Sequence, residues 1–170
     1  LFWRFIESDQ IPYCQEHEIG IMTYSSLAQG LLTGAMNAET TFSEGDNRPS
    51  TVLFQASVYE RCLQGVEELR PIAEKAGVTL PRLALSWLLG RPGVSTALVG
   101  ARTVAEIEEN ADGLPWDVRA ADLATAGQVG ASVFESLPRV PDMFQTWTRS
   151  DIQRRRYEES GQMPVEMPTS

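Results

Sequence analysis

The chain has 170 residues, and its hydrophobic fraction of 42% and charged fraction of 22% are typical of a globular protein with a sizeable core. Its net charge of −9 disfavours binding to nucleic acid or to an anionic membrane. Two isolated cysteines provide no disulfide framework and fit a reducing cytoplasm, where we expect the protein to be located. The sequence shows no signal peptide and no apolar run near the ~18 residues of a membrane span.

The first part of the chain predicts a helix, a strand and a long loop. The helix begins after Ser8 or Asp9 and carries Pro12 in its first turn. The strand covers Ile19 to Tyr24, whose apolar and β-branched residues suit a buried parallel sheet. The segment up to about Ser50 is rich in glycine, proline, aspartate and asparagine, which predicts an irregular loop. Loops of this length in a compact domain are usually functional lids or disordered segments.

The middle of the chain predicts two helices. The first runs from about Thr51 to Ala76, because apolar residues recur there every three or four positions. Its apolar stripe consists of Val58, Cys62, Val66, Leu69, Ala73 and Ala76. Pro71 should kink or split this helix, and Gly77 should end it. The second helix should start near Thr79 and stop at Gly90.

The last part predicts one more strand and several helices. The strand covers Ser95 to Val99 and leads into a helix from Val104 to about Ala111. Thr103 and Glu106 have the Thr-x-x-Glu spacing of a capping box at the start of that helix. The remaining sequence predicts a helix over 118–130, a linker over 136–141 and a short charged helix from Ser150 to Gly161.

The two predicted strands end in similar loops, and this similarity points to a site. Each strand is followed by a segment that contains glycine and hydroxyl side chains and then by the start of a helix. In α/β folds with parallel sheets, ligands bind at the edge formed by the carboxyl ends of the strands. We therefore expect the two loops to lie together at such an edge.

Four segments between about Leu1 and Trp116 have a fixed order and spacing. They read IPYCQEHEIGIMTYSSLAQGLLTG, FSEGDNR, LPRLALSWLLGRPGVSTALVGAR and AEIEEN. Together they resemble the aldo-keto reductases, in particular the branch that includes the potassium-channel β subunits. The segments match only the carboxyl-terminal part of that family.

The resemblance implies an α/β fold, namely the carboxyl-terminal part of a (β/α)8 TIM barrel with its last two strand–helix units and carboxyl-terminal helices. A complete barrel takes roughly 250 residues, so the barrel is incomplete as given. We expect residues 1–130 to form the partial aldo-keto reductase barrel and residues 131–170 to form a tail with one short helix. Because the first residue is Leu1 rather than Met, we expect a fragment of a longer protein.

The resemblance also implies that the loop after the first strand binds a dinucleotide cofactor. The residues placed to do so are Tyr24, Ser25, Leu27, Ala28, Gly30 and Arg48. Tyr24 would stack on the nicotinamide, the turn up to Gly30 would face the pyrophosphate, and Arg48 would close over the cofactor. The alternative interpretations are a core tyrosine, an ordinary Gly/Ser turn and a solvated loop arginine.

The loop after the second strand would bind the other end of the cofactor. Gly100 and Arg102 lie at a helix N-terminus, which binds anions through free N–H groups and the helix dipole. Arg102 would suit a 2′-phosphate, so NADP(H) is expected rather than NAD(H). Glu106, Glu109 and Asn110 share one helical face, where the family contacts adenine. The capping box explains Glu106 equally well without a ligand.

Some residues depart from the family pattern. Ser26 stands where proline is usual, and Ala35 stands where this branch often has lysine, so the phosphate turn should be less rigid and carry one charge fewer. The family protonates its carbonyl substrate with tyrosine, supported by lysine, aspartate and histidine from its amino-terminal half. The single lysine, Lys75, and the single histidine, His17, fit surface or packing roles. We therefore expect no catalytic and no metal-binding residue in this chain.

Two functional hypotheses follow. In the first, the chain is the carboxyl-terminal part of an NADP-dependent aldo/keto reductase that transfers a hydride between NADPH and a small carbonyl substrate. In the second, it is a free-standing, non-catalytic nucleotide-binding or assembly protein derived from that family. A sheet of two strands has exposed edges, which favours a homo-oligomer or pairing with a complementary barrel half.

Overall fold

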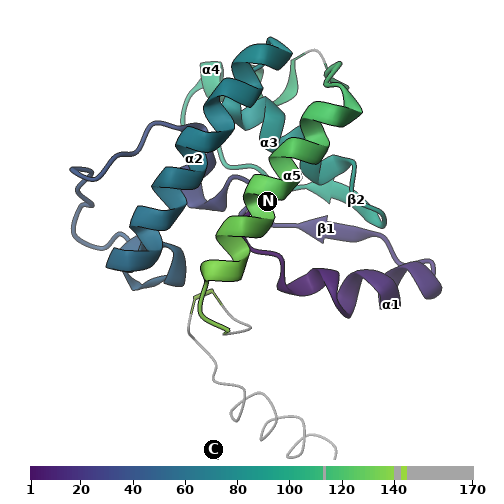
Figure 1. Ribbon diagram of the computed structural model, residues 1–170, viewed down its shortest axis with the longest axis horizontal. Helices are drawn as coiled ribbons and strands as arrows, with labels where there is room; N and C mark the ends of the chain where they lie inside the picture. Colours follow the sequence, from purple (N-terminus) through teal and green to yellow (C-terminus); the bar gives the residue numbers. More distant parts are fainter. Residues whose placement is uncertain (113, 140–142, 145–170) are drawn as a thin grey trace, which may run out of the picture.

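The computed structural model describes residues 1–112, 114–139 and 143–144. Figure 1 shows its helices and strands in one compact α/β arrangement. In chain order they are α1 (Gln10–Glu16), β1 (Ile21–Thr23), α2 (Ala56–Ala76), α3 (Leu80–Leu89), β2 (Val94–Ala97), α4 (Val104–Ala111) and α5 (Ala120–Ser136). Short 3₁₀ helices cover Phe5–Glu7, Ala28–Thr33, Arg48–Ser50 and Val52–Phe54.

The two strands lie side by side and run parallel. Met22 pairs with Thr96 and Thr23 pairs with Ala97, with an irregularity in register between Ile21 and Met22. The chain between the strands contains α2 and α3, so the connection is a helical crossover of the kind parallel strands require. Both strands form near the predicted positions: β1 covers part of the predicted range 19–24, and β2 begins one residue before the predicted range 95–99 and ends two residues before its end.

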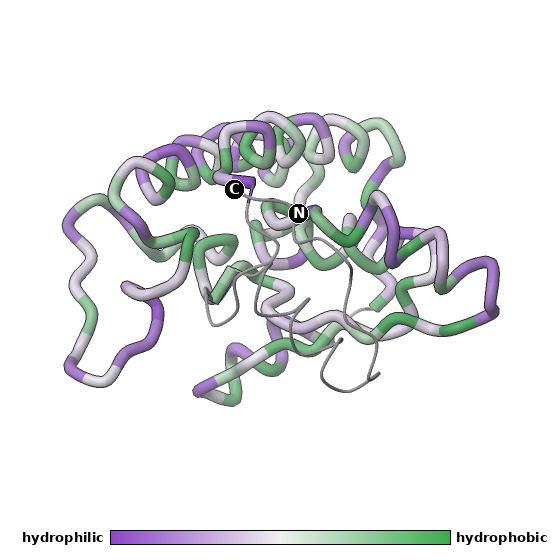
Figure 2. The backbone as a smooth tube through the Cα atoms, turned by 90° about the horizontal axis from the view of Figure 1, so that it is seen from below, coloured by the Kyte–Doolittle hydropathy of each residue, from purple (hydrophilic) through white to green (hydrophobic). Residues whose placement is uncertain are grey.

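The helices α2, α3 and α5 build the core. Helices α2 and α5 lie side by side in Figure 1, and α3 contacts both of them and β2. Seen at right angles in Figure 2, the long helices form a layer on one side of the chain, and hydrophobic and hydrophilic stretches alternate along them. The fully buried large side chains include Phe2, Leu31, Leu53, Leu69 and Leu83. A contiguous apolar core of this kind holds the loops at the sheet edge in place.

Helix α2 differs from the prediction at its start and at its proline. It begins at Ala56, because Val52–Phe54 form a separate 3₁₀ turn whose side chains are buried. It runs unbroken through Pro71, so of the two predicted outcomes the split is wrong and the kink stays a prediction. The buried residues Leu69 and Ala73 lie on either side of the proline and pack on the same core, which holds the helix together despite one lost hydrogen bond. Gly77 ends the helix with φ +68°, as predicted.

The predicted threonine cap of α4 is confirmed, and α3 has a cap of the same kind that the sequence analysis did not predict. The hydroxyl of Thr79 accepts a hydrogen bond from the Arg82 N–H, and the hydroxyl of Thr103 accepts one from the Glu106 N–H at 3.2 Å. Both hydroxyls satisfy N–H groups that have no partner within their own helix.

Among the residues that the structure describes, no helix has the length and apolar character needed to cross a membrane.

Helix α5 is longer than predicted, continuing to Ser136 rather than ending near Gly130. Gly130 lies inside this helix, and its missing side chain leaves room for Leu1 to pack against the helix. A Cβ at that position would lie 2.7 Å from the Leu1 carbonyl oxygen, so the first residue crosses the helix where a side chain is missing. The predicted division between residues 130 and 131 therefore falls inside α5, and it stays a prediction. The helix predicted from Ser150 to Gly161 lies outside the described residues.

Candidate functional site

The loops that follow the two strands meet at the carboxyl edge of the sheet. The hydroxyl of Ser26 is buried and donates a hydrogen bond to the Leu98 carbonyl at 2.9 Å. The Leu98 N–H donates to the Thr23 carbonyl at 2.8 Å, which extends the pairing of the strands beyond β1 and β2. The predicted meeting of the loops is thus seen in the structure. It depends on Ser26, the residue that replaces the family's usual proline.

The turn after β1 has an unusual backbone. Ser25, Ala28 and Gln29 have φ values of 52°, 50° and 56°, and Gly30 has φ 100°. Non-glycine residues seldom adopt this left-handed region, because the Cβ atom then crowds the following carbonyl group. A Cβ on Gly30 would also lie 2.9 Å from the Met36 side chain. The turn therefore needs glycine at this one position, and tertiary contacts hold its other residues.

Two aromatic rings stack beside this turn. Tyr24 follows β1, and its side chain is 64% exposed. Its ring lies 6.0 Å from the ring of Phe144, with an angle of 12° between the two planes. Tyr24 is therefore a surface residue, which argues against the alternative of a core tyrosine. Phe144 stacks on one face of the ring, and most of the rest of Tyr24 is exposed.

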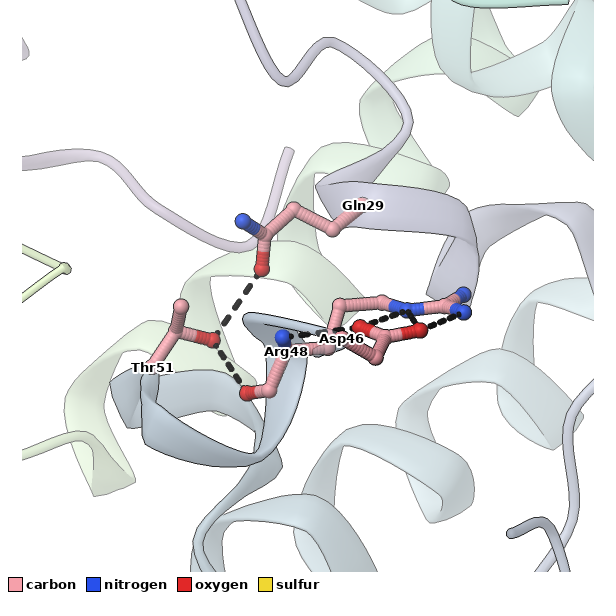
Figure 3. A network of polar contacts seen from close by, with 4 residues as sticks. All are labelled: Gln29, Asp46, Arg48 and Thr51. Atoms are coloured by element: carbon pink, nitrogen blue, oxygen red, sulfur yellow. Dashed lines mark hydrogen bonds and ion pairs between the residues drawn. The ribbon is translucent and has the colours of Figure 1, made fainter. Parts of the chain in front are cut away.

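Arg48 lies in a network of polar contacts next to the turn (Figure 3). Its guanidinium Nε donates to Asp46 Oδ1 at 2.9 Å, and its Nη2 donates to Asp46 Oδ2. This arginine lowers the pKa of Asp46 to about 2. The guanidinium also lies 4.8 Å from the centre of the Phe42 ring. Arg48 is therefore held in place by Asp46 and Phe42 and is only partly exposed, whereas its contact with a cofactor stays a prediction.

The same network joins the arginine loop to the turn. Buried Thr51 donates its hydroxyl to the Gln29 side-chain oxygen at 3.0 Å and also to the Arg48 carbonyl at 2.9 Å. Figure 3 shows these bonds beside the Asp46–Arg48 pair. Sequence analysis did not identify Gln29, Asp46 or Thr51. A signal for Asp46 was present, since an aspartate two residues before another residue commonly accepts that residue's N–H, as it does here at 2.9 Å.

The loop after β2 presents Gly100 and Arg102 at the start of α4. A Cβ on Gly100 would meet no atom within 4 Å, and the Arg102 side chain is 85% exposed. The carboxylate of Glu106 accepts a hydrogen bond from the Arg102 N–H, and it lies 3.7 Å from the Arg102 guanidinium. The Thr103 half of the capping box forms, but the Glu106 carboxylate binds the N–H of Arg102 rather than that of the N-cap residue Thr103. Its negative charge lies where we expected an anionic ligand group.

Glu109 and Asn110 lie at the end of α4, away from its N-terminus. The Glu109 carboxylate accepts a hydrogen bond from the Thr79 hydroxyl and lies 3.5 Å from Arg82 Nε. It therefore links α4 to the start of α3. Asn110 is half-buried on the same helix. The predicted adenine contacts of both residues stay predictions.

The single lysine and the single histidine have other partners. Lys75 Nζ lies 3.1 Å from Asp122 Oδ1 on α5, and Arg119 binds the other oxygen of that carboxylate at 2.7 Å. His17 is exposed, stacks on Tyr13 and lies with its Nδ1 2.9 Å from the Tyr13 carbonyl oxygen. Both residues have the packing and surface roles that the sequence suggested.

Comparisons with known proteins agree with this arrangement. The model of the Aldo/keto reductase family matches residues 1–125. Among curated proteins, the chain is 31% identical over 153 residues to "Aldo-keto reductase YhdN" of Bacillus subtilis, covering 89% of this chain and 46% of that protein. It is 36% identical over 109 residues to "Probable voltage-gated potassium channel subunit beta" of Arabidopsis thaliana, covering 62% of this chain and 33% of that protein.

A third relative and one solved structure extend the comparison. "NADH-specific methylglyoxal reductase" of Escherichia coli is 30% identical over 119 residues, covering 70% of this chain and 36% of that protein. The glycerol dehydrogenase AKR11B4 of Gluconobacter oxydans superposes with a TM-score of 0.69 at 31% identity, covering 81% of this chain and 41% of that chain. The chain thus spans less than half the length of each of these four proteins.

Proposed function

The chain belongs to the aldo/keto reductase family, and we propose that it forms part of the nicotinamide-dinucleotide site of an NADP(H)-dependent aldo/keto reductase. Such an enzyme transfers a hydride between the cofactor and a carbonyl substrate. Relatives with the names of reductases and a dehydrogenase support oxidoreductase chemistry. The observation that carries the proposal is the hydrogen bond from Ser26 to Leu98, which brings the two loops together at one sheet edge.

Each part of this edge suits one part of a dinucleotide. The exposed ring of Tyr24 offers a flat surface for the nicotinamide. The left-handed turn from Ser25 to Gly30 presents its backbone to the pyrophosphate, and successive backbone N–H groups in such a turn can form an anion-binding concavity. Arg48 adds a guanidinium group beside Gly30. The proposal assigns the adenosine end of the cofactor to the start of α4.

The preference for NADP(H) rests on Arg102. Its guanidinium is almost fully exposed at the N-terminus of α4 and could pair with a 2′-phosphate. Glu106 opposes this preference, because its carboxylate already occupies the Arg102 N–H. One relative is named as NADH-specific. The cofactor preference therefore depends on two opposing effects, the attraction of a 2′-phosphate by the Arg102 guanidinium and its repulsion by the Glu106 carboxylate. We propose that the attraction is the stronger effect.

We propose that the proton donor for the carbonyl lies outside these 170 residues. By the family resemblance, that group is a tyrosine from the amino-terminal half. Lys75 and His17 are engaged elsewhere, with Asp122 and Tyr13 respectively. The chain would therefore supply cofactor binding and part of the wall of the substrate pocket, without proton transfer.

Fluorescence titration of the 170-residue chain with NADPH and with NADH tests this proposal. We expect saturable quenching of tryptophan fluorescence, with tighter binding of NADPH. Arg102→Ala should remove the difference between the two cofactors, whereas Arg61→Ala, which changes an arginine on α2 paired with Glu68, should not. An absence of binding at millimolar concentrations of both cofactors would contradict the proposal for this chain.

A second hypothesis, an assembly role, is favoured by the surface of the sheet. In the described part of the chain, each strand pairs on one side only. Met22 in β1, Tyr24 directly after it and Leu98 directly after β2 are 62%, 64% and 49% exposed, so large apolar side chains are exposed at the sheet. We propose that a second copy or a complementary barrel half covers it. Light scattering tests the first of these partners, since a monodisperse monomer would exclude a homo-oligomer.

A further inference from the structure

We propose that Asp46 is a positioning residue for the cofactor site, because it holds the Arg48 guanidinium with its Nη1 nitrogen beside the glycine turn. This inference rests on the proposed function, in which the turn binds the pyrophosphate. Asp46 lies in the FSEGDNR segment, to which the sequence analysis assigned only the role of Arg48. The basis of the inference is the geometry of the loop shown in Figure 3.

The Asp46 carboxylate holds Arg48 at three nitrogen atoms. Oδ1 accepts from the backbone N–H at 2.9 Å and from Nε at 2.9 Å, while Oδ2 accepts from Nη2 and lies 3.1 Å from Nε. Both side chains are partly buried, with 15% of Asp46 and 28% of Arg48 exposed. A bidentate pair with low exposure fixes the plane of the guanidinium, whereas a single exposed contact would leave it free to rotate.

The pairing leaves one nitrogen atom of Arg48 without a partner. Nε and Nη2 bind Asp46, and within the described residues Nη1 makes no hydrogen bond. Nη1 is also the atom closest to the turn, 3.9 Å from where a Cβ on Gly30 would lie. Its two N–H groups are therefore available to an acceptor that lies against the Gly30 backbone. A phosphate oxygen at the pyrophosphate position would be such an acceptor.

Two further contacts hold the pair in register with the turn. The Phe42 ring lies 4.8 Å from the centre of the guanidinium and restricts its other face. Thr51 ties the arginine loop to Gln29, the residue next to Gly30. The Asp46 carboxylate neutralises the guanidinium charge, so it does not strengthen the positive potential at the turn. Its role is to orient the Arg48 side chain. Ordering of a long side chain before the ligand arrives lowers the entropy lost on binding.

A double-mutant cycle on NADPH binding tests this role. Asp46→Ala should raise the Kd for NADPH roughly three- to tenfold, because the Arg48 side chain would then become ordered only when the ligand binds. In the Arg48→Ala background, the same substitution should change the Kd by less than about twofold, because Asp46 acts through Arg48. Equal effects in both backgrounds, or an unchanged Kd in the presence of Arg48, would overturn the inference.

A matched control and a ligand-free measurement separate this inference from the proposed function. Glu44→Gln removes another carboxylate from the same loop, from an exposed residue, and should leave the Kd unchanged. In the free chain, the Nε–H signal of Arg48 in NMR spectra should be protected from exchange and lose protection in Asp46→Ala. If the Arg48 Nε–H signal of the wild type is not protected, the role of Asp46 is contradicted while the proposed function stands. Failure of the wild type to bind any nicotinamide dinucleotide sinks the proposed function, and the inference falls with it.

Discussion

The hydroxyl of Ser26 bonds to the carbonyl of Leu98 across 72 positions of sequence. Ser26 belongs to the turn after β1, and Leu98 belongs to the loop after β2. The bond is partly buried, since Ser26 is 7% exposed and Leu98 is 49% exposed. It joins the two segments to which we assign opposite ends of one ligand.

Ser26→Ala should weaken both stability and cofactor binding. The substitution removes the hydroxyl donor, and the Leu98 carbonyl loses this hydrogen bond. The free energy of unfolding should therefore fall by about 1 kcal/mol or somewhat more. Urea denaturation measures this change. Ser8→Ala is the control, because the Ser8 hydroxyl bonds to the Phe5 carbonyl at an exposed position. An equal loss in both variants would mean that the bond across the loops has no special role.

Gly65→Ala should loosen the packing of α2 against α5. A Cβ at Gly65 would lie 2.5 Å from Val133 Cγ2 and 3.1 Å from the Phe2 ring. Overpacking of this kind costs about 1–3 kcal/mol, which outweighs the gain of roughly 1 kcal/mol from alanine in a helix. Thermal or urea unfolding should therefore show a less stable protein.

Removal of the clashing methyl groups provides the control for Gly65. In the Gly65→Ala background, Val133→Ala should destabilise the protein less than it does in the wild type. The two substitutions fill and create the same space, so their effects on the free energy of unfolding should not add. Simple additivity would show that the helices have moved apart without strain at this contact.

The Asp122 carboxylate should make the stability of the protein depend on acid pH. Lys75 and Arg119 lower the pKa of this buried aspartate. A lowered pKa stabilises the fold above the unfolded-state pKa of about 3.9, and this contribution is lost as the pH falls through the lower folded-state value. Asp122→Ala should therefore be less stable than the wild type at pH 7, and the difference should shrink below about pH 4.

Glu67 offers a matched control for that pH series. It pairs with Arg70 at 2.8 Å on α2, but 65% of its side chain is exposed. An exposed ion pair contributes little, so Glu67→Ala should leave the unfolding midpoint nearly unchanged at all pH values. A pH dependence of Asp122→Ala equal to that of the wild type would contradict the assignment of the acid transition to Asp122.

The two cysteines should differ in their reaction with alkylating reagents. Burial raises the pKa of the Cys62 thiol to about 12, and its side chain is fully buried in α2. Cys14 on α1 is only partly buried. Because the thiolate is the reactive form, native protein should incorporate one equivalent of iodoacetamide at Cys14, and a second should follow only in denaturant. Peptide mass spectrometry would identify the sites, and rapid labelling of native Cys62 would contradict this prediction.

Periodicity predicted the helices well because their apolar residues face one shared core. The stripe that contains Val58, Cys62 and Leu69 is buried as predicted. The errors arose where a residue has two physical roles. Proline often breaks helices, yet packing on both sides of Pro71 keeps α2 in one piece, and α5 continues past its predicted end at 130, where Gly130 makes room for Leu1.

The site was predictable in outline and not in its polar contacts. Strand–loop–helix order places both loops at one sheet edge without any knowledge of the structure. The partners of Arg48 and Glu109 depend on side-chain directions in three dimensions, and local sequence does not determine these. Glu109 illustrates the limit, because its face of α4 was predicted to contact a ligand but its carboxylate binds Thr79 on the neighbouring helix.

The left-handed turn after β1 has a consequence for how the protein acquires its shape. Ser25, Ala28 and Gln29 each adopt a conformation that disfavours L-residues by roughly 1–2 kcal/mol. A peptide with this sequence would relax to other conformations when separated from the rest of the chain. The turn therefore depends on its tertiary contacts, which include the hydrogen bonds from Ser26 to Leu98 and from Thr51 to Gln29, so the ligand edge exists only as part of the folded protein.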